Sequence, residues 1–259
     1  MNSTPKSRPV VLTIAGLDPS GGAGIVADIK TIAALGCFPA AAVTSITFQN
    51  TTGVFGAEHQ TAATLRAQVE PIVRDVTVAA VKTGMLPTAE IVAEVARLFA
   101  EENLPPPVVD PVVVATSGDV LIDEEAFEIL TTKLFPLARI VTPNIPEAEK
   151  ITGLSIESEA DMRRAAEAIR ALGARAVLVK GGHSGRATDI LLDDGGLTEF
   201  HSEYLDVGEV HGSGCTLSAA IAAGLAKGLM LEESVAAAKS YITEAIRSAP
   251  SIGRGAKPL

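Results

Sequence analysis

Short runs of apolar and β-branched residues alternate with amphipathic segments along most of the chain. The runs have the length of buried strands, while the segments repeat apolar residues at helical spacing. We expect strands over residues 10–16, 41–48, 76–84, 108–110, 139–142 and 176–180. We expect helices over residues 22–35, 61–74, 88–102, 123–134, 146–152, 158–172, 215–227 and 231–247. This alternation predicts βαβ units and a parallel sheet with helices on both faces.

The pattern changes near the end of the chain. Residues 188–204 read as an antiparallel hairpin around the turn Asp194-Gly195-Gly196, and the last two predicted helices follow without a strand between them. A (β/α)₈ barrel needs strict alternation, so we favour an open, mostly parallel α/β sheet. Because no linker-like segment divides the chain, we expect one domain over residues 1–259, with residues 1–8 flexible.

Composition narrows the classes of protein. The 259 residues are 47% hydrophobic and carry a formal net charge of −10, with only 3% aromatic residues. An acidic chain without a basic run is not typical of a nucleic-acid-binding protein. Cys37 and Cys215 are far apart, which gives neither a disulfide framework nor the paired spacing of a zinc site. We therefore expect a reducing, cytoplasmic compartment.

One uncharged stretch could be mistaken for a membrane span. No charged residue occurs from Thr31 to Ala57, a length that could cross a bilayer. Gly36, Pro39 and several polar residues interrupt the stretch, so we interpret it as a helix end, a turn and a buried strand. The first residues also lack the apolar core of a signal peptide. We expect no membrane association.

Polar residues and glycines follow each of the six predicted parallel strands. In chain order the segments are AGLDPSGGAG, QNTTG, KTGM, DP, PNIPE and KGGHSG. In open α/β sheets, ligands bind outside the carboxyl ends of the strands. Each segment is weak by itself, but together they predict a ligand site at one edge of the sheet.

The first of these segments allows more than one interpretation. Gly22, Gly24 and Ala27 match the G-x-G-x-x-A pattern of dinucleotide-binding folds. That pattern requires an acidic ribose ligand about twenty residues later, and the uncharged stretch contains none. Two interpretations stay open: a tight glycine turn between a strand and a helix, or a loop whose backbone approaches a small ligand.

The most informative local signal is HGSGCTLSAAIAAGLAKG, over residues 211–228. Gly212, Ser213 and Gly214 precede a helix of small residues, where backbone N–H groups could bind a phosphate. Cys215 falls in the first helical turn, where the helix dipole is expected to lower the pKa of its thiol. It could be a base or a nucleophile, or a small buried apolar residue. Neither the Walker A motif nor the protein-kinase motifs occur.

His211 stands four residues before Cys215 and raises the alternative of a Cys–His hydrolase. This spacing does not establish a catalytic pair, and the nucleophile pattern G-x-S-x-G is missing. A hydrolase is therefore a poor alternative to a phosphate-binding enzyme.

Three further strand ends offer groups for a nucleotide and a metal. Asn144 and Glu147 have the spacing of a helix capping box, but Glu147 could hold Mg²⁺ through water while Asn144 helps to place phosphates. Asp110 could be another carboxylate beside the metal, or part of a strand-end turn. Lys180 could neutralise a nucleotide phosphate, or be a solvated lysine. These alternatives stay open on the residues alone.

Seven segments, taken in order, resemble the hydroxymethylpyrimidine and phosphomethylpyrimidine kinases of thiamine biosynthesis. They are TIAGLDPSGGAGIVADIKT, FQNTTGV, VKTGML, VVDPVVVATSGD, TPNIPEAEKITG, VLVKGGH and HGSGCTLSAAIAA, and the match runs from about Val10 to Ala249. The resemblance implies a ribokinase-like three-layer α/β/α sandwich with a mostly parallel sheet. It also implies ATP, Mg²⁺ and usually a homodimer.

The resemblance further implies roles for individual residues. The segment Gly212–Cys215 would be an anion hole with Cys215 as the base. The pyrimidine pocket would comprise Gly16, Asp28, Gln49, Met85 and Val112. The two polar members could supply the hydrogen bonds that the ring needs, and the methionine and valine could supply apolar contact. Without the resemblance, Asp28 would be interpreted as a solvated helix acid and Gln49 as a turn residue. Met85 and Val112 would be interpreted as core residues.

Three features depart from the family's pattern. Thr116 stands where relatives often carry lysine, and Ser213 replaces the commoner threonine. The tail SIGRGAKPL lacks the longer Gly-His-rich ending of many relatives, which leaves its contribution to the site or dimer open.

The expected activity is Mg·ATP-dependent phosphorylation of the hydroxymethyl group of the pyrimidine, followed by phosphorylation of the monophosphate. A pyridoxal or pyridoxine kinase is the nearest alternative, since its substrate is also a six-membered heteroaromatic with a hydroxymethyl group. A catalytically silent protein that senses the pyrimidine is the alternative that the uncharged Thr116 keeps open.

Overall fold

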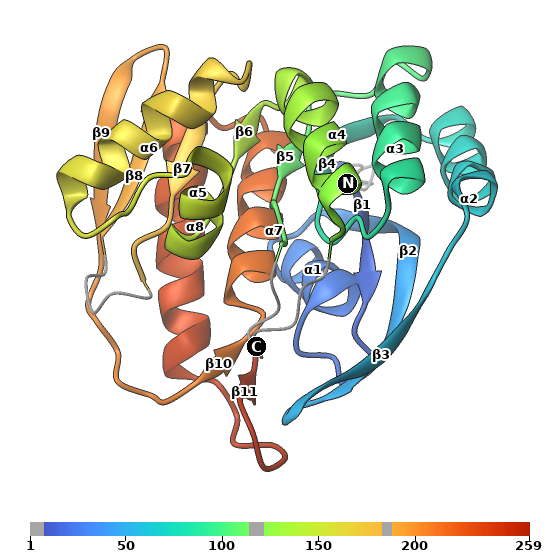
Figure 1. Cartoon of the computed structure of the whole chain (residues 1–259). Helices are drawn as coiled ribbons and strands as arrows, with labels where there is room; N and C mark the ends of the chain where they lie inside the picture. The colour runs from blue at the N-terminus through green and yellow to red at the C-terminus, as the bar shows by residue number, and fades with distance from the viewer. Residues whose placement is uncertain (1–7, 114–121, 183–187) are drawn as a thin grey trace, which may run out of the picture.

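The central element of the molecule is one nine-stranded sheet (Figure 1). The computed structural model describes residues 8–113, 122–182 and 188–259. The strand order is β3-β2-β1-β4-β5-β6-β7-β8-β9. The bounds are β1 (Val10–Leu17), β2 (Phe38–Asn50), β3 (Gly53–His59), β4 (Val78–Thr83), β5 (Val108–Val109), β6 (Ile140–Val141), β7 (Val177–Val179), β8 (Thr188–Asp193) and β9 (Gly196–His201). Strands β2, β1, β4, β5, β6 and β7 run parallel, while β3, β8 and β9 add antiparallel edges.

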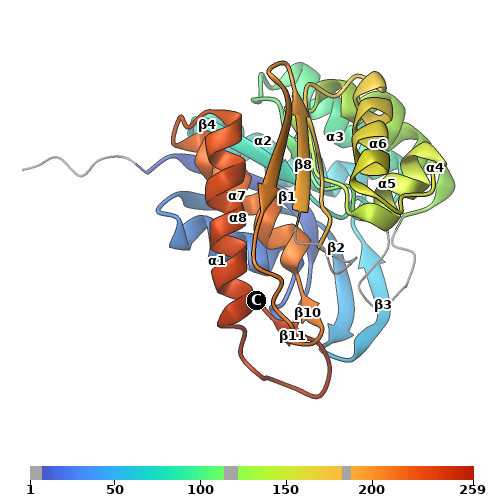
Figure 2. The same ribbon diagram turned by 90° about the vertical axis from the view of Figure 1, so that its left-hand side faces the viewer.

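Helices cover both faces of this sheet (Figures 1 and 2). One face carries α1 (Gly24–Ala34), α7 (Ser213–Ala226) and α8 (Leu231–Arg247). The other carries α2 (Ala62–Asp75), α3 (Ala89–Glu101), α4 (Glu124–Ile129), α5 (Ile145–Thr152) and α6 (Glu159–Ala171). The predicted three-layer α/β/α sandwich with a mostly parallel sheet is therefore confirmed.

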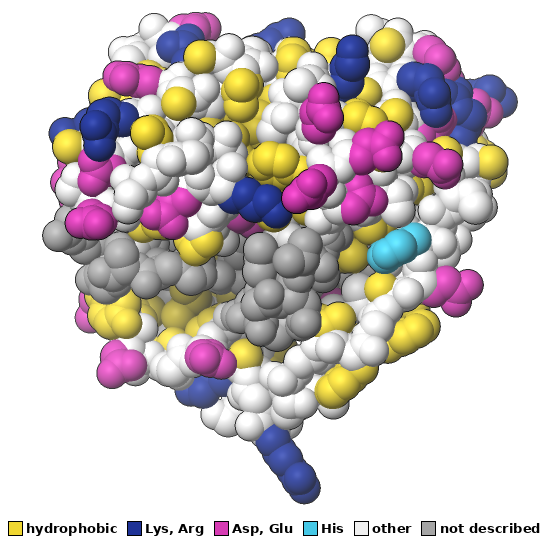
Figure 3. Space-filling model, in the orientation of Figure 1, with side chains coloured by type: hydrophobic (Ala, Val, Ile, Leu, Met, Phe, Trp, Pro, Cys, Tyr) yellow, Lys and Arg dark blue, Asp and Glu magenta, His cyan; other side chains and the backbone are white. Residues whose placement is uncertain are grey.

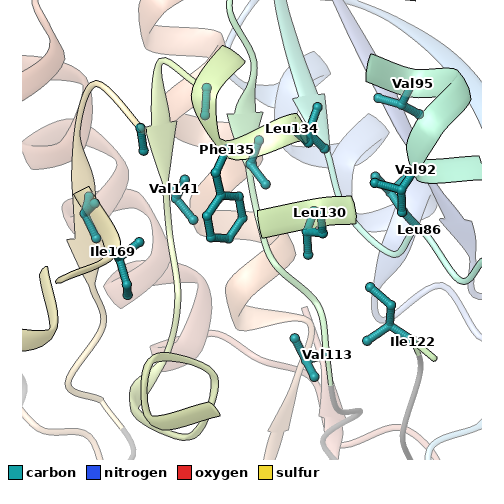
Figure 4. Close-up of a cluster of buried hydrophobic side chains, with 14 of the residues drawn as sticks. Leu86, Val92, Val95, Val113, Ile122, Leu130, Leu134, Phe135, Val141 and Ile169 are labelled. Atoms are coloured by element: carbon teal, nitrogen blue, oxygen red, sulfur yellow. The ribbon is translucent and has the colours of Figure 1, made fainter. Parts of the chain in front are cut away.

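Two apolar clusters lie on the two faces of the sheet because successive strand residues point to opposite sides. In β1, Leu12 and Ile14 join the cluster under α2 to α6, whereas Val11 joins the cluster under α1, α7 and α8. Figure 4 shows the first cluster, in which Phe135 lies beside Val141. Each fully buried side chain of this size contributes about 1.5–3 kcal/mol. This packing on both faces fixes the positions of the strand ends.

Most predicted elements are found with small shifts at their ends. The hairpin predicted over residues 188–204 is formed by β8 and β9. The helix predicted over residues 123–134 is shorter as an α-helix: α4 continues as a π-helical turn, Leu130–Leu134, and a 3₁₀ turn, Phe135–Leu137. Pro136 explains the change, since proline cannot continue an α-helix without losing a hydrogen bond and clashing with the preceding turn.

Strand β3 was not predicted, and β2 is longer at both ends than the strand predicted over residues 41–48. The segment QNTTG reads as a loop after a strand, but Gln49 and Asn50 continue β2, and β3 folds back on it as an antiparallel hairpin. Pro39 is tolerated in β2 because β3 pairs only from Ser45 onward, so the proline faces an uncovered part of the edge.

A second, two-stranded sheet was also missed. Strand β10 (Val210–His211) pairs in parallel with β11 (Lys257–Pro258), which brings the tail beside the start of α7. Paired segments of this length carry no periodicity that a sequence could reveal.

The surface mixes acidic and basic side chains over the face shown in Figure 3. Apolar side chains gather along the β2–β3 hairpin, where Ile46, Phe48 and Phe55 are exposed. Within the three described ranges, no helix is long and apolar enough to cross a membrane. The uncharged stretch from Thr31 to Ala57 instead spans the end of α1, β2 and most of β3.

Candidate active site

A cavity of about 590 Å³ opens at the carboxyl ends of the parallel strands. Its walls come from the ends of β1, β2, β4 and β5, from the start of α7, from the segment 202–210 and from α8. It is lined by all the predicted site residues except one: Gly16, Gln49, Met85, Asp110, Val112, Asn144, Glu147, Lys180, Gly212, Ser213, Gly214 and Cys215. The exception is Asp28. The predicted clustering at one sheet edge is thus found.

The start of α7 forms one wall of the cavity. The helix begins at Ser213, two residues earlier than predicted, and Gly212 is its N-cap with a left-handed φ of 89°. A Cβ atom on Gly212 would lie 1.9 Å from the carbonyl oxygen of Gly22, so only glycine allows this approach. The first N–H groups of a helix have no partner within the helix, and no acidic residue occupies this first turn. The arrangement can bind an anion.

Cys215 lies in this first turn and contributes to the cavity wall. Burial raises the pKa of its thiol to about 11, although Lys82 and a hydrogen bond from the backbone of Gly24 act to lower it. The expected lowering of this pKa is therefore wrong. The cause is desolvation, which disfavours the thiolate more than the helix dipole and the nearby cation favour it.

Asp110 and Lys180 form a buried ion pair beside the start of α7. Lys180 Nζ donates to Asp110 Oδ1 at 3.0 Å, and the hydroxyls of Thr142 and Ser218 donate to the same carboxylate at 3.2 and 3.3 Å. Burial acts to raise the pKa of Asp110, but Lys180 and Lys82 outweigh it and hold that pKa below its usual 3.8. Asp110 is therefore an anion, and Lys180 is neither a solvated lysine nor a cation without a counter-charge.

A Cβ atom on Gly214 would stand 3.1 Å from Lys180 Nζ and 3.4 Å from Asp110 Oδ2. The ion pair therefore abuts the backbone of the anion-binding turn. An anion held by that turn would lie near a fixed cation.

Asn144 and Glu147 form the helix capping box that their spacing allows, and both also line the cavity. Each donates a backbone N–H to the other's side chain at 2.8 Å, which is a complete capping box at the start of α5. Glu147 is nevertheless buried and lines the cavity. Burial raises the pKa of Glu147 to about 7, with Asp110 adding to the rise and Lys180 opposing it.

The carboxylates fit a magnesium ion that arrives with a phosphate ligand. Asp110 and Glu147 both line the cavity and interact electrostatically. No group of three or more His, Cys, Asp or Glu side chains with metal-binding geometry occurs in the described ranges. Mg²⁺ commonly uses one or two carboxylates, with water and substrate phosphates completing its octahedron. These donors therefore suit a shared Mg²⁺ better than a permanent protein cage.

A network around Asp18 joins the loop after β1 to the start of α7. Asp18 accepts hydrogen bonds from the backbone of Ser20, Gly22 and Ala23 at 2.8–3.1 Å, and His211 Nε2 lies 3.1 Å from its Oδ2. His211 is thus engaged by Asp18, which does not support a Cys–His pair. A Cβ atom on Gly22 would lie 2.6 Å from the His211 ring. Gly22 therefore allows close packing, and Gly24, the first residue of α1, lines the cavity.

The remaining predicted pocket residues gather between β1, β2 and β4. Gln49 Nε2 donates to Thr47 Oγ1 at 2.7 Å, which fixes the amide at the cavity wall. Met85 lies against Gly16, where a Cβ atom would be 3.0 Å from its sulfur. This corner combines an amide with apolar surface, as a small heteroaromatic ligand requires.

Comparison with known proteins agrees with this geometry. The family profile of phosphomethylpyrimidine kinase matches residues 18–259. The hydroxymethylpyrimidine/phosphomethylpyrimidine kinase of Streptomyces coelicolor is 45% identical over 98% of this chain and 95% of its own. The protein of the same name from Rhizobium meliloti is 48% identical over 96% of each chain. The chain belongs to the phosphomethylpyrimidine kinase family.

This phosphomethylpyrimidine kinase family member also resembles a longer bifunctional protein and two kinases of known structure. The chain spans about half (52%) of the thiamine biosynthesis bifunctional protein ThiED of Geobacter sulfurreducens, to which it is 47% identical over 98% of its length. The crystal structure of phosphomethylpyrimidine kinase from Clostridium difficile superposes with a TM-score of 0.83 at 45% identity, covering 92% of this chain and 100% of that one. Pyridoxal kinase from Bacillus subtilis, in complex with ADP, gives 0.91 at 37% identity over 98% and 97%.

Asp28 is placed differently from the expectation for this family member. Its side chain is fully buried and does not line the cavity. It accepts hydrogen bonds from Thr13 Oγ1 at 2.5 Å and from Lys82 Nζ at 2.8 and 3.0 Å. It is therefore not a solvated helix acid, and it is not part of the cavity lining.

Two buried charged residues near the site, Lys82 and Asp18, were not predicted from the sequence. Lys82 had a recognisable signal, because a lysine within an otherwise apolar buried strand needs a counter-charge. Asp18 had none, since its partner His211 is 193 positions away. Thr116 falls in residues 114–121, which the structure does not describe.

Proposed function

We propose that this family member transfers the γ-phosphoryl group of ATP to 4-amino-5-hydroxymethyl-2-methylpyrimidine, and then phosphorylates the resulting monophosphate. The supporting observation is that one cavity combines the start of α7, Cys215, the Asp110–Lys180 pair and the Gln49–Met85 corner. Relatives that match over nearly their full length carry the name of this kinase. A cavity that holds both the acceptor and the nucleotide would allow direct transfer of the phosphoryl group from one to the other.

The acceptor is proposed to lie in the corner formed by Gly16, Gln49, Met85 and Val112. The amide of Gln49 can donate and accept, so it can pair with the aminopyrimidine edge. Met85 and Val112 supply apolar contact to the ring. The hydroxymethyl group then points toward Cys215 and the start of α7.

The phosphates of ATP are proposed to lie between the start of α7 and the ends of β6 and β7. The N–H groups from Gly212 to Gly214 would hold the charge that develops on the transferring group, since phosphoryl transfer depends mainly on positioning and electrostatic stabilisation. Lys180 and Asn144, whose strand ends are bridged, would place the other phosphates. When Mg²⁺ is bound, Asp110 and Glu147 would hold it, directly or through water, against the phosphates.

Cys215 is proposed to accept the proton of the hydroxymethyl group as the oxygen attacks phosphorus. A thiol whose pKa is about 11 holds a small thiolate fraction at neutral pH, so this role predicts turnover that rises with pH. The cavity position of the thiol supports this role.

A pyridoxal kinase is the second candidate, because pyridoxal kinases superpose with higher TM-scores than the Clostridium kinase. The Bacillus subtilis enzyme gives 0.91, and the Staphylococcus aureus enzyme in complex with pyridoxal gives 0.89 at 32% identity over 98% of this chain and 93% of that one. Sequence identity points the other way, with 45–48% to the pyrimidine kinases. We therefore favour the pyrimidine as substrate.

The test is to incubate the purified protein with Mg·ATP and each acceptor separately: hydroxymethylpyrimidine, its monophosphate and pyridoxal. Product masses should show one added phosphoryl group on each of the two pyrimidines. Phosphorylation of pyridoxal alone would contradict the proposal in favour of the second candidate. ATP left unconsumed with every acceptor would support a silent binding protein.

We further propose a cytoplasmic homodimer, as the resemblance implies. The exposed Ile46, Phe48 and Phe55 on the β2–β3 hairpin support an interface at that edge, since apolar patches on a surface commonly mark contacts. Light scattering after gel filtration should give twice the chain mass. Phe55→Ser should shift the protein toward the monomer if this edge is the interface.

A further inference from the structure

The tail of the chain, residues 249–259, passes along the outside of the cavity walls. All of these residues are described by the structure, and none of them lines the cavity. After α8 the chain returns to the edge of the sheet at which the cavity opens, where β11 lies beside β10 (Figures 1 and 2). The tail then contacts three segments in turn: the turn of the β2–β3 hairpin, β10 and the loop after β1.

The first contact is with Thr51 in the hairpin turn. Its carbonyl oxygen accepts a hydrogen bond from the backbone N–H of Ala256 at 2.9 Å. Its Oγ1 accepts from the backbone N–H groups of Arg254 and Gly255 at 3.3 and 3.4 Å. A Cβ atom on Gly255 would lie 1.9 Å from the same carbonyl oxygen, so only glycine permits this approach. The turn directly follows the end of β2, which carries Gln49 of the proposed pyrimidine pocket.

The second contact is with β10, directly before α7. Strand β11 pairs in parallel with β10, and the backbone N–H of Lys257 donates to the carbonyl oxygen of Glu209 at 2.9 Å. Both residues of β10 line the cavity, and the next residue, Gly212, is the N-cap of α7. The tail therefore holds the segment that leads into the anion-binding turn.

The third contact is with the loop after β1. A Cβ atom on Gly22 would lie 3.1 Å from the Cβ atom of Pro258, so this loop packs closely against β11. Lys30 is exposed on α1, and its Nζ donates to the carbonyl oxygen of Gly21 at 2.7 Å and also to a backbone oxygen of Leu259. Leu259 also packs against the apolar cluster under α1, α7 and α8. The end of the tail is thus anchored beside another wall of the cavity.

The tail joins two walls whose separation matters for the proposed reaction. The hydroxymethyl oxygen has to lie close to the γ-phosphorus, and a misplacement of about 1 Å can lower a rate about 10²-fold. One wall is the acceptor corner, formed by Gly16, Gln49, Met85 and Val112, and the other is the start of α7. Strand β3 is the edge strand and is exposed along most of its length, so packing under β3 does not hold the hairpin turn in place.

We propose that the tail is a strap that sets the separation between the acceptor corner and the start of α7. Thr51, Gly255 and Lys30 are its positioning residues, because they anchor the tail to the hairpin turn and to the loop after β1. The effect of the strap on catalysis rests on the proposed function, whereas its hold on the two walls does not.

The first test compares Gly255→Ala with Gly53→Ala, a matched control in the same hairpin. The added Cβ atom would meet the carbonyl oxygen of Thr51 at residue 255, whereas it would have nothing within 4 Å at residue 53. Neither glycine has a positive φ, so backbone strain does not distinguish the two variants. Gly255→Ala should lower kcat at saturating substrates at least about tenfold, toward the 10²-fold cost of a 1 Å misplacement. Gly53→Ala should keep the wild-type kcat.

Thermal melts and nucleotide titrations separate positioning from folding. If the tail only stabilised the fold, Gly255→Ala would melt at a lower temperature and keep its kcat when assayed well below that temperature. The affinity of Gly255→Ala for ATP alone should stay close to that of wild type, because the N–H groups at the start of α7 remain. Equal kcat values in the two glycine variants would overturn the proposal.

Lys30→Met tests the strap from its other end, and the exposed position of Lys30 makes misfolding no concern. This variant should also lower kcat, and Lys30→Arg, which keeps a donor at this position, should restore it. Lys30 and Gly255 contact different segments, so independent effects on kcat would multiply in the double variant. If both residues act through the tail, the double variant should be no slower than Gly255→Ala. Unchanged kcat in Lys30→Met, or multiplied effects, would overturn the proposal.

Hydrogen exchange measured without any substrate separates a failure of the strap from a failure of the proposed function. In Gly255→Ala, backbone amides in residues 45–54 and 209–212 should exchange faster than in wild type and in Gly53→Ala, because both segments lose a common support. Unchanged exchange, or faster exchange in only one segment, would show that the tail does not join the two walls. If both segments exchange faster but the wild-type protein does not phosphorylate hydroxymethylpyrimidine, the proposed function fails and the strap stands.

Discussion

Cys215→Ala removes the thiol from the cavity wall and keeps a residue that suits the first turn of α7. If Cys215 accepts the hydroxyl proton, its loss should lower kcat by about 10²–10⁴-fold, the usual range for a general base. This range corresponds to about 2.7–5.4 kcal/mol of lost transition-state stabilisation. ATP binding should change little, since the backbone N–H groups at the start of α7 remain. A steady-state assay of kcat and a nucleotide titration of the folded variant separate the two effects.

The pH dependence of kcat in the wild-type protein also tests whether Cys215 is the base. With a thiol pKa of about 11, the thiolate fraction grows as pH rises. Where the transfer step limits turnover, kcat should therefore rise about tenfold per pH unit between about pH 6 and about pH 9. In Cys215→Ala this slope should disappear.

Cys37→Ala is the matched control for Cys215→Ala. Cys37 is the other free cysteine, it is fully buried, and its Sγ lies 3.6 Å from the carbonyl oxygen of Ala223, outside the cavity. This variant should lose roughly 1 kcal/mol of stability and keep its turnover. A kcat of Cys215→Ala within about threefold of wild type lies below the general-base range and would refute the base role.

Three further variants test other parts of the site. Gln49→Leu should weaken binding of hydroxymethylpyrimidine by about 1–3 kcal/mol in a calorimetric titration, because a polar group of the ligand loses its partner; unchanged affinity would remove Gln49 from the pocket. Glu147→Gln should raise the Mg²⁺ concentration for half-maximal rate about 10–100-fold, whereas a pure capping role would cost only about 1 kcal/mol of stability in thermal melts and leave the magnesium titration intact. Asp18→Asn should lower the free energy of unfolding in urea by about 1.5–3 kcal/mol, because the amide cannot accept all the hydrogen bonds of the carboxylate. The variant should also have a lower kcat. Normal turnover would show that the link between Asp18 and His211 does not position α7.

The fold was largely predictable because its strands are buried on both faces. In β1 and β7 almost every residue is apolar and buried, so each strand stands out against the amphipathic helices beside it. The β2–β3 hairpin was harder because β3 is exposed along most of its length and Gly56 interrupts its pattern. A strand without a buried face leaves little periodicity in the sequence.

The cavity wall was predictable from position, whereas the charge partners were not. Parallel strands bring their carboxyl ends together, so Asp110 and Lys180 could be expected at one edge without any distance being known. Their 3.0 Å contact, and the partnership of Asp28 with Lys82, depend on side chains that are 70 and 54 positions apart. The predicted lowering of the Cys215 pKa was wrong for the same reason. Burial, which depends on the folded chain, raises this pKa more than the helix dipole, which the local sequence reveals, lowers it.

A competition reaction tests the central claim most directly. The protein is given γ-labelled ATP, Mg²⁺ and equal concentrations of hydroxymethylpyrimidine and pyridoxal, and the labelled products are separated over time. We expect label first in the pyrimidine monophosphate and then in the diphosphate, at a rate that Cys215→Ala lowers by about 10²–10⁴-fold. Label that accumulates in pyridoxal phosphate, or only in inorganic phosphate, would contradict the account.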